Sequence, residues 1–110
     1  MAYTVEFLKT AAEELADRPD DIQRQILRKV ERLKNDPRPV GAKPLNSPEK
    51  FLRLRVGDHR VIYRVEGKHL VILVVKIGDR KDVYDDLKVL ATRAKAWRQT
   101  KTRPASSRRR

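Results

Sequence analysis

The segment from residue 52 to residue 65 constrains the fold of this chain more than any other feature. In each half of the segment, apolar residues occupy every second position: Leu52, Leu54 and Val56, then Val61, Tyr63 and Val65. Side chains two apart on a strand lie on the same face, so each half is predicted to be a strand with one buried face. Gly57 and Asp58 between the halves are typical of a tight turn. The segment is therefore predicted to be an antiparallel hairpin.

Before the hairpin, the sequence predicts one strand and two helices. Tyr3, Val5 and Phe7 alternate with polar residues, which predicts the strand. Thr10 and Glu13 have the spacing of a capping box and predict a short helix that runs to about Asp17. Pro19 is compatible with the start of a second helix. The apolar stripe of that helix is Ile22, Ile26, Leu27, Val30 and Leu33. Residues 38–49, which are rich in proline, are predicted to be mostly loop.

After the hairpin, residues 70–77 are apolar at both odd and even positions, as expected of a strand that is central or covered on both faces. A final helix is predicted from its apolar stripe of Val83, Leu87, Leu90, Ala91, Ala94 and Trp97. The predicted order is β-α-α-β-β-β-α, an α+β fold with two N-terminal helices on a small, mainly antiparallel sheet and a C-terminal helix. Residues 1–98 are predicted to be one domain, and residues 99–110 a basic, disordered tail.

Several classes of protein and site are excluded by composition. The chain has 110 residues, which suits a single core. It has no cysteine, so thiolate chemistry and disulfides are excluded, and His59 and His69 are too few to predict a metal site. We expect no cofactor. No apolar run reaches the length of about 20 residues that a membrane helix needs, and we expect a cytoplasmic protein.

Positive charge is concentrated in two regions. The formal net charge is +12, and residues 91–110 hold eight basic residues and no acidic one. Residues 50–81 hold nine basic residues against three acidic ones. A polyanion is the partner that such a surface predicts, and nucleic acid is favoured over a membrane because no long basic amphipathic helix leads the chain.

The arginines of the hairpin are candidate phosphate ligands. Arg53 and Arg55 share a face of the first strand, and pairing around Gly57-Asp58 brings Arg55 close to Arg60. Like charges at this spacing repel, and an anion between them would remove the cost, since guanidinium groups bind phosphate with two hydrogen bonds. Three further candidates are Arg64, on the second strand of the hairpin, and Arg80 and Lys81, which follow the last strand. Tyr84 adds an aromatic ring on which a base of single-stranded RNA can stack.

Each of these residues also has a purely structural interpretation. An antiparallel sheet with one solvated face can fill that face with arginine. Tyr63 and His59 occupy strand positions of the same parity as the apolar core residues, which indicates that they face the core. The alternative role of His59 is that of a proton carrier. His69 is predicted to lie in a solvated turn. Sequence-adjacent carboxylates such as Asp20 and Asp21 point apart on a helix, which indicates helix-start charges instead of an acid/base pair.

The segments FLRLRVGDHRVIYRVEG and VVKIGDRKDVY resemble the RelE/ParE toxin superfamily of type II toxin–antitoxin systems. The likeness covers about residues 3–90. Its most specific parts are R-x-R-x-G-x-x-R-x-x-Y, from Arg53 to Tyr63, and G-x-R-x-x-x-Y, from Gly78 to Tyr84. RelE-like members are ribosome-dependent endoribonucleases that cut mRNA, and this branch is favoured by the presence of both Arg80 and Tyr84.

The resemblance implies a role for each matched residue. Arg53 and Arg60 would bind the phosphate in its charge-rich transition state, Arg80 would stabilise the leaving oxygen, and Tyr84 would orient the base. RelE-like enzymes often have lysine at the first two positions, and an arginine is a poor general base because its pKa lies above about 12. Arg55 is therefore expected to act through its charge, with Arg64 and Lys81 binding RNA. No general base is assigned.

Two alternatives remain open at this point. ParE-like toxins inhibit DNA gyrase without nuclease activity and carry similar hairpin segments. A nucleic-acid-binding module without enzymatic activity would need only the charge. The superfamily also implies a cognate antitoxin, which would cover the arginines or displace the final helix, with the ribosome and mRNA as further partners.

Overall fold

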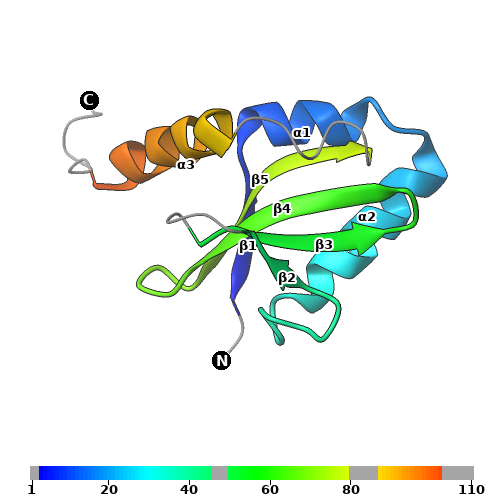
Figure 1. Ribbon diagram of the computed structural model, residues 1–110, viewed down its shortest axis with the longest axis horizontal. Helices are drawn as coiled ribbons and strands as arrows, with labels where there is room; N and C mark the ends of the chain where they lie inside the picture. The colour runs from blue at the N-terminus through cyan, green and yellow to red at the C-terminus, as the bar shows by residue number, and fades with distance from the viewer. Residues whose placement is uncertain (1–2, 46–49, 80–86, 103–110) are drawn as a thin grey trace.

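The computed structural model of the chain describes residues 3–45, 50–79 and 87–102. The elements are β1 (Thr4–Phe7), α1 (Lys9–Ala16), α2 (Asp20–Arg32), β2 (Lys43–Pro44), β3 (Leu52–Val56), β4 (His59–Glu66), β5 (Val71–Asp79) and α3 (Leu87–Thr102). One sheet has the strand order β1-β5-β4-β3-β2, and only its β1–β5 pair is parallel (Figure 1). The predicted α+β fold with a mainly antiparallel sheet is confirmed.

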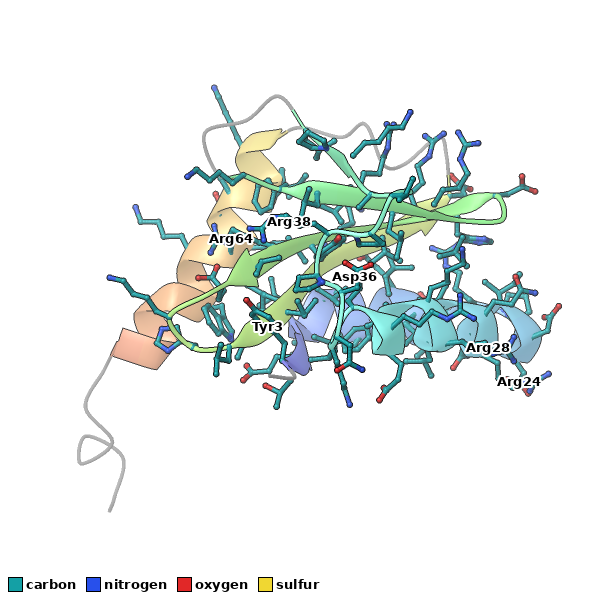
Figure 2. All side chains as sticks on the ribbon, turned by 90° about the horizontal axis from the view of Figure 1, so that it is seen from below. Tyr3, Arg24, Arg28, Asp36, Arg38 and Arg64 are labelled. Atoms are coloured by element: carbon teal, nitrogen blue, oxygen red, sulfur yellow. The ribbon has the colours of Figure 1, made fainter. Side chains whose placement is uncertain are left out.

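The first face of the sheet is covered by α1 and α2, which lie together on one side of it in Figure 2. The apolar stripe of α2 buries Ile26 and Val30, and α1 contributes Ala11. These side chains pack on residues that alternate along three strands: Leu52, Leu54, Val56, Val61, Tyr63, Ile72, Val74 and Ile77. The alternation predicted for the hairpin therefore corresponds to one continuous core beneath the helices.

The second face of the sheet also carries an apolar core, which the sequence analysis did not predict for the hairpin. Leu90, Ala94 and Trp97 of α3 cluster with Phe51, which precedes β3, and with strand residues of the opposite parity: Ile62, Val71, Leu73 and Val75. The run of apolar residues in β5 is thus explained, because consecutive side chains enter different clusters. The idea of one wholly solvated face is wrong, since α3 covers part of it.

A bulge in β5 modifies the second face. Ile62 of β4 lies opposite Lys76, but its neighbour Tyr63 lies opposite Val74, so Val75 is the extra residue. Lys76 shares the face of Ile62, whereas Ile77 returns to the first core. The bulge therefore brings a lysine to the second face without losing the apolar alternation on the first.

Three local predictions differ from the structure. The capping box at Thr10 is not formed, because α1 starts at Lys9 after Leu8 and has no side-chain cap. Within the predicted loop, Lys43 and Pro44 pair with β3 and form a fifth strand. The last helix extends to Thr102, so residues 99–102 are helical where a tail was predicted. Val83 and residues 103–110 lie outside the described residues, and no described helix is long and apolar enough to span a membrane.

Candidate functional site

The hairpin of β3 and β4 places Arg55 directly opposite Arg60, which confirms the predicted juxtaposition. Arg53 lies opposite Ile62, so all three arginines share the second face of the sheet. The turn that sets this register contains Gly57 with φ of 59°, a left-handed conformation that glycine adopts without the strain of a side chain. We call Arg53, Arg55 and Arg60 the arginine site.

The three side chains of the arginine site differ in exposure. Arg55 is exposed, Arg53 is partly buried and Arg60 is buried. On its other side, Arg60 lies opposite Gly78 of β5, which contributes no side chain to this face. A small hollow of about 50 Å³ is lined by Arg55, Gly57, Asp58 and Arg60. Arg60 is therefore held within the sheet, and the exposed Arg55 lines the same hollow.

This geometry suits the binding of a phosphate group. Two guanidinium groups on directly opposite strand positions repel each other, and Asp58 at the turn lines the hollow beside them. An anion that accepts hydrogen bonds from both guanidinium groups would relieve the repulsion. Because the partly buried location lowers the local dielectric constant, the attraction is stronger than on an open surface.

Arg64, which was predicted to bind RNA, is separated from the arginine site. It lies four positions from Arg60 on the same strand, a distance of about 13 Å at the usual strand rise. Its side chain is buried, its Nε atom donates to the carboxylate of Glu66, and its guanidinium group lies 5.7 Å from the centre of the Phe51 ring. These contacts anchor Arg64 in the second apolar cluster.

A cation that the sequence analysis missed lies beside the arginine site. Lys43 of β2 is exposed and pairs with Arg53 of β3, so it extends the row of cations on the second face. A strand at Lys43 was difficult to predict, because Pro44 follows it and proline in a strand is confined to sheet edges. β2 is such an edge strand.

A network of ion pairs around Glu14 joins α1, β5 and α3. The Glu14 carboxylate accepts hydrogen bonds from Arg93 Nη1 and Nη2 at 3.2 Å each, from Lys76 Nζ at 3.2 Å and from the Ile77 N–H at 3.0 Å. Arg93 also donates to the Val75 carbonyl oxygen at 3.0 Å. β1 pairs with β5 only as far as Val74, so these side chains satisfy backbone groups on the part of β5 that β1 does not cover.

The network explains why Lys76 and Glu14 can both be buried or half-buried. Burial raises the pKa of the Glu14 carboxyl, but the hydrogen bonds from Arg93, from the Ile77 N–H and from Lys76 outweigh it, so this pKa lies below its usual value. A second polar contact holds the other end of α3, where Trp97 Nε1 donates to Glu6 Oε1 at 2.8 Å. The positions involved are distant in sequence, so no local pattern could have predicted them.

Tyr63 and the histidines lie away from the arginine site. Tyr63 is buried as predicted, and its hydroxyl group donates to the Pro37 carbonyl oxygen at 2.7 Å. Burial, aided by Asp36 and opposed by Arg38, raises the pKa of Tyr63 to about 12. His59 lies opposite Val56 and therefore on the first face, which separates it from the arginines. His69 is exposed in a turn, as predicted, and its ring meets the Trp97 ring edge-on at 5.7 Å.

Three predicted site residues cannot be placed relative to the arginine site. Arg80, Lys81 and Tyr84 lie outside the described residues. The last described residue of β5 is Asp79, opposite His59 and next to the Arg60–Gly78 pair. Arg80 follows it directly in the sequence.

The chain is similar to toxins of one family in both sequence and structure. Residues 5–84 match the family described as the ParE toxin of the type II toxin–antitoxin system parDE. A putative RelE-like toxin protein of Escherichia coli is 31% identical over 77% of this chain and 93% of that protein. Toxin RelG of Mycobacterium tuberculosis is 30% identical over 76% of this chain and 98% of that toxin.

Solved structures give the same result. The archaeal RelE–RelB complex from Pyrococcus horikoshii contains a chain that matches this fold with a TM-score of 0.65 and 30% identity, over 74% of this chain and 99% of that one. The toxin–antitoxin complex RelBE2 from Mycobacterium tuberculosis matches with a TM-score of 0.64 and 26% identity, over 73% of this chain and 100% of that one. The family match spans more than half of the chain, and these relatives are matched over nearly their full length. The chain therefore belongs to the RelE/ParE family of toxins from type II toxin–antitoxin systems.

Proposed function

We propose that this toxin is a ribosome-dependent mRNA interferase, an endoribonuclease that stops translation by cutting mRNA. The observation that carries the proposal is the pairing of Arg55 with Arg60 on directly opposite strand positions, beside a small hollow that both side chains line. The similarity to toxins named RelE-like and RelG supports the same branch. This function requires the cytoplasm, where ribosomes translate mRNA.

In the proposed reaction, a ribose 2′-oxygen attacks the adjacent phosphorus while the bond from phosphorus to the 5′-oxygen breaks. The 2′-hydroxyl loses its proton and the 5′-oxygen gains one, so the products are a cyclic phosphate and a free 5′-hydroxyl. Negative charge increases on the phosphate oxygens in the transition state. Arg60, fixed in the sheet, and Arg55 would donate to those oxygens, and Arg53 would bind a neighbouring phosphate.

The described residues of the arginine site lack a general base, and this suggests why the ribosome is needed. Arginine stays protonated at neutral pH. His59 lies on the opposite face of the sheet. Rate enhancement would therefore depend on charge stabilisation and on a ribosome that holds the mRNA in the geometry for in-line attack. We assign Arg80 to the leaving oxygen and Tyr84 to the base by similarity, with Lys81 as a further RNA contact, whereas Arg64 has a structural role.

The test is cleavage of an mRNA that is being translated in a purified system, with the same naked mRNA as the control. We expect cleavage only during translation. Arg60→Ala is expected to reduce the rate by about 100- to 1,000-fold, the usual effect of removing a fixed donor to the transition state. Arg80→Ala and Tyr84→Phe are expected to reduce it as well. Rapid cutting of naked RNA by the wild-type protein would contradict the dependence on the ribosome.

Inhibition of DNA gyrase is the second candidate function, because the matching family model is that of the ParE toxin. The arginine hairpin alone does not separate the two branches. A supercoiling assay with purified gyrase, run beside the cleavage assay, does so. Growth arrest with intact mRNA and blocked supercoiling would identify the gyrase inhibitor.

We also propose that a cognate antitoxin binds this chain. Several structural relatives were solved as toxin–antitoxin complexes. A groove of about 690 Å³ runs between the start of α1 and α3, with Phe7, Leu8, Val89 and Trp97 among its apolar residues and Lys9 and Lys88 among its cations. An amphipathic, acidic segment would complement this lining. Co-expression with the antitoxin is expected to restore growth, and loss of copurification in a Val89→Asp variant would support this location.

A further inference from the structure

From Arg24 onward the exposed surface of α2 is mainly basic, whereas its first turn holds Asp20 and Asp21, and α2 takes no part in the proposed chemistry. Arg24, Arg28 and Arg32 follow one another at intervals of four residues, so they form one ridge with a spacing of about 6 Å. All three are exposed, as is Lys29. Figure 2 shows Arg24 and Arg28 on the surface of this helix. Like charges four apart on a helix repel each other, and an anionic partner would offset this repulsion.

The basic surface of α2 is hollowed where it meets the hairpin. A hollow of about 310 Å³ is lined by Gln25, Arg28, Lys29, Arg32, Val56 and Gly57. Within the described part of the chain, three of these residues are cations and none is acidic. The nearest acidic residue of the second half of α2, Glu31, forms an ion pair with Lys34 at 2.7 Å. Ligand pockets of similar or larger volume are usually apolar, so this charged lining favours phosphate over a small apolar ligand.

The hollow on α2 and the small hollow of the arginine site both include Gly57 of the hairpin turn. Gly57 has no side chain to separate them, and a Cβ atom at this position would lie 3.9 Å from Gln25 Oε1. The cations of α2 and those of the hairpin therefore lie on two sides of one turn. A single nucleic-acid partner can contact both.

We infer that α2 and the hairpin turn form a second RNA contact, which binds the phosphate backbone of an RNA double helix. This inference rests on the proposed function, in which the toxin works on the ribosome. α2 has no aromatic residue on which an unpaired base could stack, and single strands are usually held by such stacking. Cations at regular spacing on a rigid helix instead match a duplex that is recognised by its backbone. The contact holds the toxin next to the strand that the arginine site cuts.

The test compares two variants that remove the same charge. In the first, Arg28, Lys29 and Arg32 are changed to glutamine, which preserves helix propensity. In the matched control, the exposed Arg38, Lys68 and Lys95 are changed to glutamine. Binding to an RNA hairpin with a stem of about 16 base pairs, to its unpaired strand and to a DNA duplex of the same sequence is measured over a range of salt concentrations. Thermal unfolding shows that both variants are folded.

The α2 variant is expected to bind the RNA duplex about tenfold more weakly or worse, with a salt dependence reduced by about one phosphate contact for each cation removed. The control is expected to change by less than about twofold. Equal losses in the two variants would overturn the inference, as would tighter binding of the DNA duplex or of the unpaired strand. A dependence on total charge alone would produce such equal losses.

A cleavage assay on translated mRNA separates this inference from the proposed function. The α2 variant is expected to need more ribosomes for half-maximal rate while its maximal rate is unchanged, whereas Arg60→Ala lowers the maximal rate. If the wild-type protein cuts no mRNA, the proposed function fails while the duplex-binding result still decides the inference. If the wild-type protein cuts mRNA and the α2 variant behaves like the control in both assays, only the inference fails.

Discussion

The two faces of the sheet differ in what their side chains do. The first face, under α1 and α2, carries one apolar core that spans three strands, with Ile26, Tyr63 and Ile72 among its buried residues. The second face is divided. One part is apolar under α3, and the other carries the arginine site. The comparison shows that one strand can serve a core and a charged site on the same face when a helix covers only part of its length.

The largest effect is expected from cavities in the first face. Ile72→Ala should lower the free energy of unfolding by about 2–5 kcal/mol, because a fully buried side chain is lost from the strand at the centre of the packing. Urea unfolding measures this. Leu73→Ala, next to it on the second face and also fully buried, is expected to cost as much. A loss below about 1 kcal/mol in Leu73→Ala would show that the second face has no true core.

The next effect concerns the ion pairs that hold α3 over the second face. Glu14→Gln is expected to cost about 1–3 kcal/mol, less than a fully buried pair, because the Glu14 side chain is 22% exposed. Glu13→Gln, exposed on the same helix, serves as the control. A loss in Glu14→Gln no larger than that in Glu13→Gln would mean that α3 is held by its apolar residues alone.

The same carboxylate predicts a dependence on pH. The pKa of Glu14 is lower in the folded protein than its ordinary value of 4.5, so its contribution is complete above that value and is lost as the pH falls through the folded pKa. The stability difference between wild type and Glu14→Gln is expected to shrink below about pH 4.5. A stability difference between wild type and Glu14→Gln that stays constant across this pH range would contradict the ion pairs of Glu14.

A smaller effect is expected from the hydroxyl group of Tyr63, which lies in the core of the first face. Tyr63→Phe removes the hydrogen bond to Pro37 and should cost about 1 kcal/mol. The pKa of Tyr63 is raised to about 12 from 10.0, so the stability it contributes is complete below pH 10 and is lost as the pH rises toward 12. Absorbance titration is expected to lose its most alkaline step in the variant. An unchanged titration would place the raised pKa on another tyrosine.

The smallest effect on stability is expected in the arginine site. Arg55→Gln should change the free energy of unfolding by no more than about 0.5 kcal/mol, and in the stabilising direction, because an exposed like charge opposite Arg60 is removed. Sulfate should stabilise the wild-type protein more than this variant, as measured by thermal unfolding. Lys68→Gln is the control. A destabilisation above about 1 kcal/mol would show that Arg55 has a structural role instead.

Local patterns were sufficient to predict most of the fold and the centre of the site. Alternation on both sides of Gly57 predicted the β3–β4 hairpin, and its register then brought Arg55 and Arg60 together. The contribution of α3 to the second face could not be predicted, because Ile62 and Leu90 are far apart in sequence. The same holds for Glu14, whose partners Lys76 and Arg93 come from other elements. Parity showed where Arg64 points, but not that Glu66 and Phe51 enclose it.

The parallel pairing of β1 with β5 joins the first strand of the chain to the last. Thr4 lies opposite Val71, a separation of 67 residues. During synthesis, α1, α2 and the hairpin therefore emerge before the strand on which both clusters depend, and contacts across such a separation form slowly. The arginine site likewise lacks the Gly78 neighbour of Arg60 until β5 is complete. The chain thus acquires its two cores and the complete surroundings of Arg60 only after β5 has been synthesised.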